Sequence, residues 1–473
     1  MQPLDSGDLS LAYTVGSKQE ALFQAIRDKI VSGLWHKGGK LPSSRQLAEE
    51  LSVSRNTVTL VYEQLVAEGY IESKRGSGFY ITLELPEHFI GSESKKAHSR
   101  GQLNVTRINA PFAPGVPDLE QFPYAIWQRL LQRHLSRTSL LGNQDLQGDH
   151  NLRVALSNYL AGSRSVKCSP ERIIITAGAQ QALSIALMVT THESGSVLME
   201  QPGYAQMTKV MKLLGLNYVP VKVEERIGLN VEQAIRSAAK ALYITPSNQY
   251  PMGTTLDTEQ RLKLIDWATR TRSWIIEDDY DSEFQFAHRP YTSLQGLAGQ
   301  ISQDDRVIYI GSFSKVMFNG LRLGYMVVPE PLLPKCLEIK DALSGDSPTH
   351  TQAALADFIS EGYLLRHIRK MRRLYKSKYE HMVESVATHF GDAVEVVSQP
   401  AGMHLTLKWV QGINEDEFVE LAEKEELIVR ALGYYEFGSN TDRKWNGAVL
   451  GFGNIALDQI DSKVSQLAKL FYR

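Results

Sequence analysis

Short apolar runs alternate with helical stretches after about residue 111, and this alternation constrains the fold more than any other feature of the chain. Each run is long enough for one strand and too short for a buried helix. Continuous apolar runs are typical of strands covered on both faces of a mostly parallel sheet, whose ligands bind at the carboxyl ends of the strands. The runs are RIIIT (172–176), SVLME (196–200), ALYIT (241–245), WIIED (274–278), VIYIG (307–311) and GYMVV (324–328).

The chain is too long for a single ordinary core, because its 473 residues exceed the usual size of one domain. Residues 1–82 form a first candidate domain, in which short helical patterns precede a hairpin pattern. Residues 83–110 are polar and aperiodic, which is typical of a linker. The sequence therefore predicts a second, larger α/β domain over residues 111–473.

A change of pattern divides this larger domain. A long charged helical region at about 352–389 precedes two strand-like runs, MHLTLKW and ELIVRAL. We therefore predict a large part at about 140–345 and a smaller α+β part at about 346–473, to which residues 111–139 also belong.

The composition excludes several classes of protein. With 51 basic and 53 acidic side chains, any nucleic-acid or membrane partner must be argued from a local patch. The two cysteines, Cys168 and Cys336, lie far apart without metal-ligand spacing, as expected in a reducing compartment. The N-terminus lacks a signal-peptide pattern, and no apolar stretch approaches the roughly 18 residues of a membrane span. We expect a cytoplasmic protein without a membrane segment or a metal site.

The first domain begins with two helical patterns. Leu22, Ile26 and Ile30 recur at four-residue spacing, which places them on one face of a helix. Ser43 and Gln46 have the spacing of a capping box and predict the start of a second helix.

A third helix is predicted to begin after Ser54, which can cap its first turn. Its buried side falls at helical spacing on Val58, Val61, Tyr62 and Leu65. Arg55, Asn56 and Thr57 are left at the exposed N-terminal turn, where a recognition helix meets base edges and phosphates. The following stretch, YIESKRGSGFYI, predicts two strands around a basic, glycine-containing tip.

A small helical module that docks on another protein is the alternative reading, since residues 1–82 contain nine basic and nine acidic groups. However, LPSSRQLAEELSVSRNTVTLVYEQLVAEGYIESKRGSGFYI resembles the winged helix-turn-helix of GntR-type bacterial regulators over the whole module. The resemblance implies that this domain binds double-stranded DNA. It also implies the contacting residues, which are Arg45, Ser54, Arg55, Asn56 and Thr57 and, in the wing, Arg75, Gly76, Ser77 and Gly78.

A lysine in the larger domain stands among groups that suit a phosphate. Lys315 lies in GSFSKVMFNGLRLGY, directly after a strand-like run. Ser312, Ser314 and Arg322 nearby can donate hydrogen bonds and balance the charge of a phosphate. Taken alone, a serine-flanked lysine is more often an ordinary surface residue.

Three other stretches supply the remaining groups of a pyridoxal phosphate site. Asp278, at the end of a strand-like run, can keep a pyridine nitrogen protonated, and Tyr280 can donate to the ring's phenolate oxygen. The turn in TAGAQQAL can present the amides of Ala179 and Gln180 to a phosphate at a helix N-terminus. Tyr204, in EQPGYAQ, can stack on the pyridine ring.

In this order, the stretches resemble the fold-type-I aminotransferase pattern, from PGVPD (114–118) to LRLGY (321–325). That resemblance implies pyridoxal 5'-phosphate as cofactor and Lys315 as its Schiff-base residue. Joined to a winged helix, the pattern resembles the MocR (GabR-like) subfamily of GntR regulators over nearly the full chain. The subfamily implies a pyridoxal phosphate-dependent transcription factor that forms a head-to-tail homodimer, with each DNA-binding domain packed on the partner's aminotransferase-like domain.

The sequence departs from the enzyme pattern at two cofactor positions. Leu141 stands where related enzymes carry a tyrosine that commonly reaches the partner subunit's phosphate. Tyr250 replaces the asparagine of the usual Asn-Pro pair. Asn248, two positions earlier, is a candidate for the contact to the phenolate oxygen, and the sequence leaves open whether its side chain reaches that atom.

The effector-binding end departs as well. Ala448 and Val449 occupy the stretch in which aminotransferases place an arginine for the substrate carboxylate. Arg430 lies at a position that resembles the carboxylate-binding arginine of GabR-like regulators, whose second arginine aligns with Gln206. An ordinary structural ion pair is the alternative role for Arg430.

Three functions fit these residues. In the first, an amino compound forms an external aldimine, Arg430 binds its carboxylate, and the change reaches the DNA-binding domain. In the second, the chain is an active aminotransferase, or retains half-transamination, with a DNA-binding domain attached. In the third, a PdxR-like regulator senses pyridoxal phosphate itself. The first is the leading reading, and the missing enzyme-type arginine and the intact recognition helix argue against the second as the main task.

Overall fold

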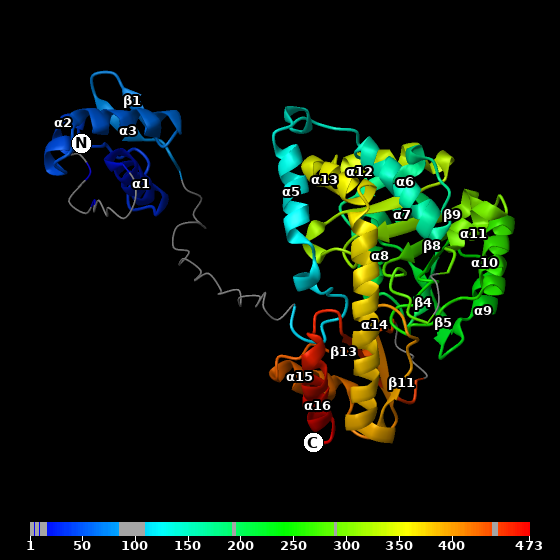
Figure 1. The fold of residues 1–473 in the computed structure, drawn as a ribbon. Coiled ribbons are helices and arrows are strands. Elements are labelled where there is room, and N and C mark those ends of the chain that lie inside the picture. Colours follow the sequence, from blue (N-terminus) through cyan, green and yellow to red (C-terminus); the bar gives the residue numbers. More distant parts are fainter. Residues whose placement is uncertain are drawn as a thin grey trace. The chain divides into compact units, whose positions relative to one another are not determined.

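The computed structural model divides into two compact units, Met1–Leu103 and Asn104–Arg473 (Figure 1). Of the predicted linker, residues 85–108 lie outside the residues that the structure describes. The described residues are 4, 9, 17–84, 109–191, 195–287, 291–437 and 443–473.

The N-terminal unit is a helical module with a hairpin, as predicted. Within its described residues, it contains α1 (Lys18–Val31), α2 (Ser44–Glu50), α3 (Arg55–Ala67), β1 (Ile71–Lys74) and β2 (Gly78–Ile81). The two strands pair antiparallel, and the predicted apolar faces of α1 and α3 form the core. The predicted starts of the second and third helices are confirmed.

Serine caps set these helix starts. The hydroxyl of Ser43 accepts from the amide of Gln46 at 3.2 Å, and that of Ser54 accepts from the amide of Thr57 at 3.0 Å. The capping box predicted at Ser43 is only half present, because the Gln46 side chain donates to Glu50 instead of returning to the cap.

The C-terminal unit is built on a mixed sheet in the order β3-β10-β9-β8-β7-β4-β5-β6. β10 runs antiparallel to both of its neighbours, β3 and β9, while the strands from β9 to β5 are parallel. All six predicted strands are confirmed. The bounds are β3 (Ile173–Thr176), β4 (Val197–Gln201), β5 (Tyr218–Glu224), β6 (Gly228–Leu229), β7 (Ala241–Ile244), β8 (Trp274–Asp279), β9 (Val307–Ser312) and β10 (Gly324–Val327).

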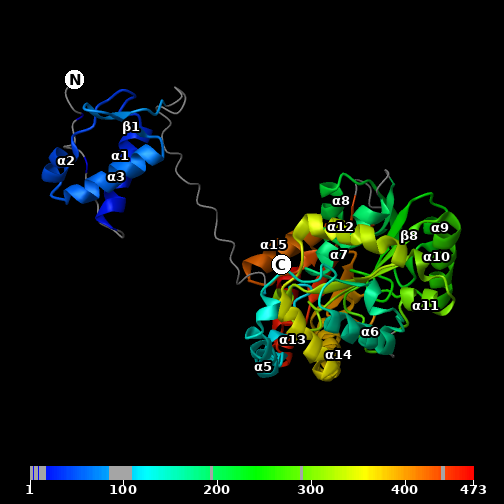
Figure 2. The ribbon, with the colours of Figure 1, turned by 90° about the horizontal axis from the view of Figure 1, so that it is seen from above.

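Helices cover both faces of this sheet (Figures 1 and 2). Successive strand residues accordingly enter different apolar clusters: Ile173 and Ile175 pack on one side of the sheet and Ile174 on the other. The helices are α5 (Tyr124–Leu135), α6 (His150–Arg164), α7 (Ala179–Thr190), α8 (Ala205–Leu213), α9 (Val231–Ile235), α10 (Thr258–Thr271), α11 (Leu294–Gln300), α12 (Leu333–Ser344) and α13 (Thr349–Ser360).

The smaller part is an antiparallel sheet in the order β11-β12-β14-β13, with helices packed against it. Its long helix α14 reaches from the level of α13 to that of β11 and α16 (Figure 1). The elements are α14 (Tyr363–Phe390), β11 (Glu395–Val396), β12 (His404–Trp409), α15 (Glu415–Lys424), β13 (Arg430–Ala431), β14 (Asn446–Gly451) and α16 (Ile460–Phe471).

The structure refines two sequence predictions in this part. The helical region expected at about 352–389 is confirmed and consists of two helices, because Gly362 adopts a positive φ of 75° between α13 and α14. The strand expected in ELIVRAL shrinks to Arg430–Ala431, since the chain then turns into a 3₁₀ helix. None of the described helices is both long and apolar enough to cross a membrane.

Candidate cofactor and DNA-binding sites

The carboxyl ends of β8 and β9 bring the predicted aspartate and lysine to one edge of the sheet. These strands are parallel, and Asp278 lies opposite Ile310. Lys315 follows the end of β9, and the carboxylates of Asp281 and Asp278 both act on its charge. The sequence prediction that these groups share a site agrees with their placement.

Asp278 is buried with one oxygen unused. Its side chain is 5% exposed, and the Tyr243 hydroxyl donates to Oδ2 at 2.8 Å. Oδ1 has no hydrogen-bond partner among the described residues. Burial raises the pKa of Asp278 to about 7, although the Tyr243 hydrogen bond opposes this shift. A protonated pyridine nitrogen would give the unused oxygen a charged N–H donor, so the residue fits the cofactor expected here.

Lys315 is half-buried, and its amine is held by backbone. Nζ donates to the carbonyl of Gly115, which belongs to a segment far away in the sequence. Burial lowers the pKa of Lys315 to about 8, while the Asp281 and Asp278 carboxylates act in the opposite direction. A lysine with a lowered pKa is a better nucleophile near neutral pH, as a carbonyl-binding residue requires.

The predicted phosphate cradle lies at the N-terminus of α7. Gly178, the N-cap, adopts φ 86° and provides no side-chain cap, so the first turn at Ala179 and Gln180 keeps its positive end open. The exposed Arg322 donates to the Ala177 carbonyl at 3.2 Å beside this turn. A helix N-terminus with an adjacent guanidinium suits an anion.

Two hydroxyls face each other near this cradle. The Oγ atoms of Ser312 and Ser314 lie 2.8 Å apart, and both residues are half-buried. Tyr204, at the N-cap of α8, receives a hydrogen bond at 3.0 Å from the Gln180 side chain. The helix that would hold a phosphate therefore also positions the ring expected to stack on the cofactor.

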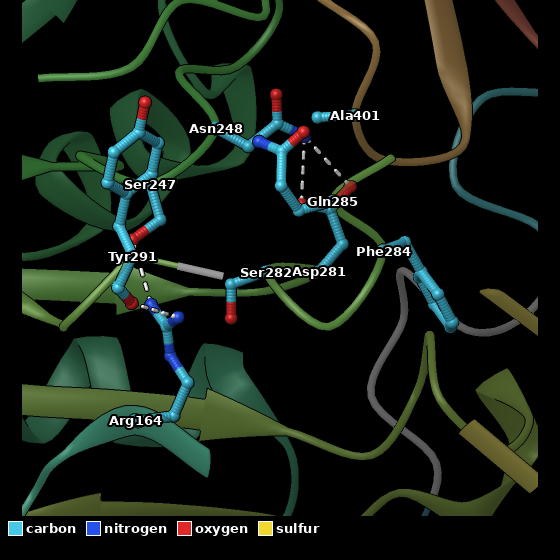
Figure 3. Close-up of a pocket in the computed structure, with 9 residues that line it drawn as sticks. All are labelled: Arg164, Ser247, Asn248, Asp281, Ser282, Phe284, Gln285, Tyr291 and Ala401. Atoms are coloured by element: carbon cyan, nitrogen blue, oxygen red, sulfur yellow. Dashed lines mark hydrogen bonds between the residues drawn. The ribbon is translucent and has the colours of Figure 1, made fainter. Parts of the chain in front are cut away.

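The two candidates for the phenolate oxygen already have protein partners. The Tyr280 hydroxyl donates at 2.9 Å to the backbone carbonyl of Asn248. The Asn248 amide donates to both Asp281 oxygens, at 2.9 and 3.1 Å, beside a small cavity (Figure 3). The Oδ1 atom of Asn248 is buried and lacks a partner in the described part of the chain. Either group must exchange a partner before it can serve a ligand.

The positions that depart from the enzyme pattern take separate places in the fold. Leu141 is 72% exposed, and Gln206 is half-buried on α8. Tyr250 packs against several rings and shares a hydroxyl–hydroxyl hydrogen bond of 2.9 Å with Tyr435. No simple pattern in the sequence predicts this aromatic contact, because Tyr435 lies in another part of the fold.

Arg430 is exposed on β13, directly opposite Val449 of β14. Ala448 and Val449 are fully buried. Within the described ranges, Arg430 forms no ion pair, so the structure does not show the structural ion pair named above as its alternative role. Burial raises the pKa of the nearby Tyr435 phenol, while the Tyr250 hydrogen bond and the positive charge of Arg430 act in the opposite direction.

Sequence reasoning missed two groups of the site. Asp281 is 2% exposed and contacts Asn248, and burial raises its pKa to about 8. It lies in the same acidic stretch as Asp278, so its spacing gave a signal. Gly115 contributes a carbonyl, for which no side-chain pattern exists. His, Cys, Asp and Glu residues do not cluster as metal ligands anywhere in the described part of the molecule.

The predicted DNA-contacting residues lie together on the N-terminal unit. Ser54, Arg55 and Asn56 are exposed at the start of α3, and Thr57 is half-buried behind them. Arg45 is exposed on α2 and forms a surface ion pair with Glu49 at 3.2 Å. The hairpin tip, Arg75, Gly76, Ser77 and Gly78, is exposed throughout.

Comparison with known families matches both units. Residues 18–81 match the bacterial regulatory proteins of the gntR family, and residues 112–443 match aminotransferase class I and II. Among solved structures, α-aminoadipate aminotransferase LysN from Thermus thermophilus superposes with a TM-score of 0.70 at 24% identity, covering 77% of this chain and 92% of that one. An archaeal alanine:glyoxylate aminotransferase gives 0.70 at 26% identity, covering 76% and 90%.

Two regulators resemble the chain over nearly its whole length. The probable rhizopine catabolism regulatory protein MocR of Rhizobium meliloti is 34% identical, over 95% of this chain and 93% of the relative. The pyridoxine biosynthesis transcriptional regulator PdxR of Corynebacterium glutamicum is 32% identical, over 92% and 91%. The chain therefore belongs to the MocR family of HTH-type transcriptional regulators, which join a GntR-type DNA-binding domain to an aminotransferase-like domain.

Proposed function

We propose that this protein is a pyridoxal phosphate-dependent transcriptional regulator that responds to an amino compound. The unpaired Oδ1 of buried Asp278 is the observation that carries the proposal, because a buried carboxylate oxygen needs a donor that the described residues do not provide. In this proposal, residues 1–82 bind promoter DNA, residues 83–110 link the domains, and residues 111–473 bind cofactor and effector in the cytoplasm.

The proposed cofactor-binding set is Lys315, Asp278, Tyr280, Tyr204, Ala179, Gln180, Asn248, Ser312, Ser314 and Arg322. When bound, pyridoxal phosphate supplies a carbonyl carbon and an electron-withdrawing ring. Lys315 would hold that carbon covalently through Nζ, and Asp278 would keep the ring nitrogen protonated. The α7 N-terminus, the two serines and Arg322 would bind the phosphate.

An effector amine would displace Lys315, and the exposed guanidinium of Arg430 would bind its carboxylate. A single arginine suits an amino compound with one carboxylate. The effector can shift the regulator only by its different affinity for two conformations, which we assign to movement of the smaller part. We further propose that two chains form a head-to-tail homodimer, through which this movement reaches DNA.

A second candidate is a sensor of pyridoxal phosphate itself, which the similarity to PdxR favours. In that case, cofactor occupancy would change DNA affinity without any amino compound. Turnover as an aminotransferase is a third outcome, which the lysine, the aspartate and the aminotransferase fold permit chemically.

A spectral titration tests these functions against each other. Purified protein with pyridoxal phosphate should absorb near about 420 nm, and borohydride should fix the cofactor on Lys315. A panel of amino monocarboxylates is then added, and DNA affinity is measured in parallel. A stable spectral shift with one compound, with changed DNA affinity, supports the effector-responsive regulator. Continuous keto-acid release would identify an enzyme, and a protein without the band would refute the proposal.

Arg55→Ala is expected to weaken DNA binding by roughly tenfold to a hundredfold. The substitution removes an exposed cation from the N-terminal turn of α3, and a base-contacting arginine contributes about 1–3 kcal/mol. The measurement is a binding titration on a duplex that the wild-type protein has selected from a random pool. Gln64→Ala, exposed at the other end of α3, is the matched control and should bind like the wild type. Equal affinities for the two variants would contradict the proposed recognition turn.

A further inference from the structure

The segment Pro111–Asp118, here called the strap, lies against Lys315. Its Gly115 carbonyl accepts the hydrogen bond from Lys315 Nζ and a longer one, of 3.4 Å, from the Asn319 amide. A β-carbon added at Gly115 would lie 2.3 Å from Lys315 Nζ, so the contact depends on a bare backbone. The strap is therefore part of the immediate surroundings of the lysine.

The same strap is bound to the smaller part of the unit. Its Pro111 carbonyl accepts from the Ile428 amide at 2.9 Å, and its Phe112 carbonyl accepts from the Gly451 amide at 2.8 Å. A β-carbon at Gly451 would lie 2.4 Å from the Ala113 carbonyl oxygen, and one at Gly453 would lie 2.3 Å from that of Val116. The strap thus packs on β14 and the residues after it at backbone contact distance.

A buried lysine on α14 anchors the end of the strap. Lys378 Nζ donates to Asp118 Oδ2 at 2.8 Å and to the Gly453 carbonyl at 2.8 Å, and its side chain is 1% exposed. The Tyr375 hydroxyl accepts from the Asp118 amide at 2.9 Å. A buried ammonium is costly unless it is fully paired, and removing one partner leaves the other uncompensated. Such a pair fixes a geometry more reliably than it adds stability.

We infer that Lys378 is a positioning residue for Lys315. Through Asp118, it holds the strap in the one place where the Gly115 carbonyl can accept from the Lys315 amine. This inference deepens the proposed function and rests on it, since the reactive role of Lys315 belongs to that proposal.

Two physical effects follow from the contact. A carbonyl that accepts one N–H of a neutral amine fixes the direction of the nitrogen lone pair, which is the reacting electron pair. Gly115 also lies against Nζ and takes the place of water on that side of the amine, which favours the uncharged form. Both effects are lost when the strap moves, and neither requires Lys378 to touch a ligand.

Other charged and titratable groups in the described part of the chain also act on these two lysines. Asp278 and Asp281, at the end of β8, face Lys315, as does His404 of β12, which burial keeps neutral by lowering its pKa to about 4. Asp118 and Glu120 act on Lys378, and its ammonium lies 5.8 Å from the centre of the Tyr375 ring. A change at Lys378 therefore leaves the carboxylates that face Lys315 in place.

The test measures the pH profile of Lys315 in the full-length, cofactor-free protein. Reductive methylation with labelled formaldehyde reports the neutral amine, and mass spectrometry quantifies the modification at Lys315 at each pH. In the wild type, the midpoint is expected near 8, where burial places the pKa of this lysine. In Lys378→Met, the released strap admits water, and the midpoint should rise by about one pH unit toward that of an ordinary lysine.

Lys340→Met is the matched control. Lys340 is also fully buried and donates to two carbonyls, those of Leu146 and Gly345, but it does not contact the strap. Its loss should leave the Lys315 midpoint unchanged, and melting curves show whether each variant is folded. Asp118→Asn and Tyr375→Phe weaken the same contacts between α14 and the strap with a smaller change of side chain. If Lys378→Met does not fold, the Lys315 midpoint is measured in these two variants instead.

The outcomes separate this inference from the proposed function. A raised midpoint in the anchor variants, with none in Lys340→Met, supports the positioning role. Wild-type midpoints in the folded anchor variants would overturn it, even if the cofactor band is present. A missing band in the wild type would refute the cofactor proposal while the methylation result still stands, because that experiment contains no cofactor.

Discussion

Lys315→Ala should lack the absorption band near about 420 nm and any borohydride-stable cofactor adduct, while it still binds DNA. The reason is that alanine has no amine to hold the cofactor carbon, whereas the residues that cap and pack α3 lie in the other unit. We expect this variant to lose covalent attachment of the cofactor completely. Absorption spectra, peptide mass spectrometry after borohydride treatment and DNA titration measure the three properties on one preparation.

Lys315→Arg is the matched control for charge. Arginine keeps a cation near Asp278 and Asp281 but is always protonated, so it cannot form the covalent link. Both variants should therefore lose the adduct, and only the alanine variant should alter the local charge. An adduct at a different lysine in either variant would contradict the assignment of Lys315.

Asp278→Asn is expected to weaken cofactor binding by roughly 30-fold to several thousand-fold, because removal of one partner of a buried charged hydrogen bond costs about 2–5 kcal/mol. An amide cannot balance a protonated ring nitrogen as the carboxylate does. The dissociation constant is measured by absorbance or fluorescence titration of cofactor-free protein. Asp305→Asn, at an exposed surface position, should bind the cofactor like the wild type.

Asp278→Asn should also stabilise the cofactor-free protein at high pH. The folded-state pKa of Asp278, about 7, lies above its usual value of 3.8, so the native state binds this proton more tightly than the unfolded state does. Stability from this group is therefore greatest in acid and falls as pH rises from about 4 to 7. At about 1.4 kcal/mol per unit, the full effect is of the order of 4 kcal/mol.

Melting temperatures of the two cofactor-free proteins between pH 5 and 8 test this prediction. The gap in favour of Asp278→Asn should widen as the pH rises. A constant gap would show that the Asp278 carboxyl does not change its protonation in this range. If Asp278→Asn binds the cofactor more weakly and is more stable without it, Asp278 contributes to cofactor binding and lowers the stability of the cofactor-free protein.

The sequence was sufficient for elements whose pattern is local. The six fully buried strands and the capped helix starts at Ser43 and Ser54 are read from runs and spacings, because burial on both faces removes the ambiguity of alternation. β5 was not predicted, because Tyr218–Glu224 lies near the edge of the sheet and contains both exposed and buried residues. The break between α13 and α14 at Gly362 was not predicted, because helix-forming residues continue on both sides of it.

The sequence suggests candidate site residues where a residue's type carries the chemistry. Lys315, Asp278 and the α7 N-terminus were predicted in this way, and the structure shows how each is placed. The contact between Lys315 and Gly115 could not be predicted from the sequence, because a backbone carbonyl has no sequence signature and the two residues are 200 positions apart. Nor could the engagement of Tyr280 with the Asn248 carbonyl be foreseen, since it depends on how two loops pack.

The strap has a thermodynamic consequence for signalling. It begins at residue 111, directly after the predicted linker, so in the sequence only residues 111–114 separate that linker from Gly115, whose carbonyl accepts from Lys315. If an effector acts on the strap, as the proposed function implies, DNA binding and effector binding are two coupled equilibria of one chain. Coupling free energy is reciprocal. A promoter that tightens in response to effector must therefore, when bound, tighten the protein's hold on that effector by the same factor.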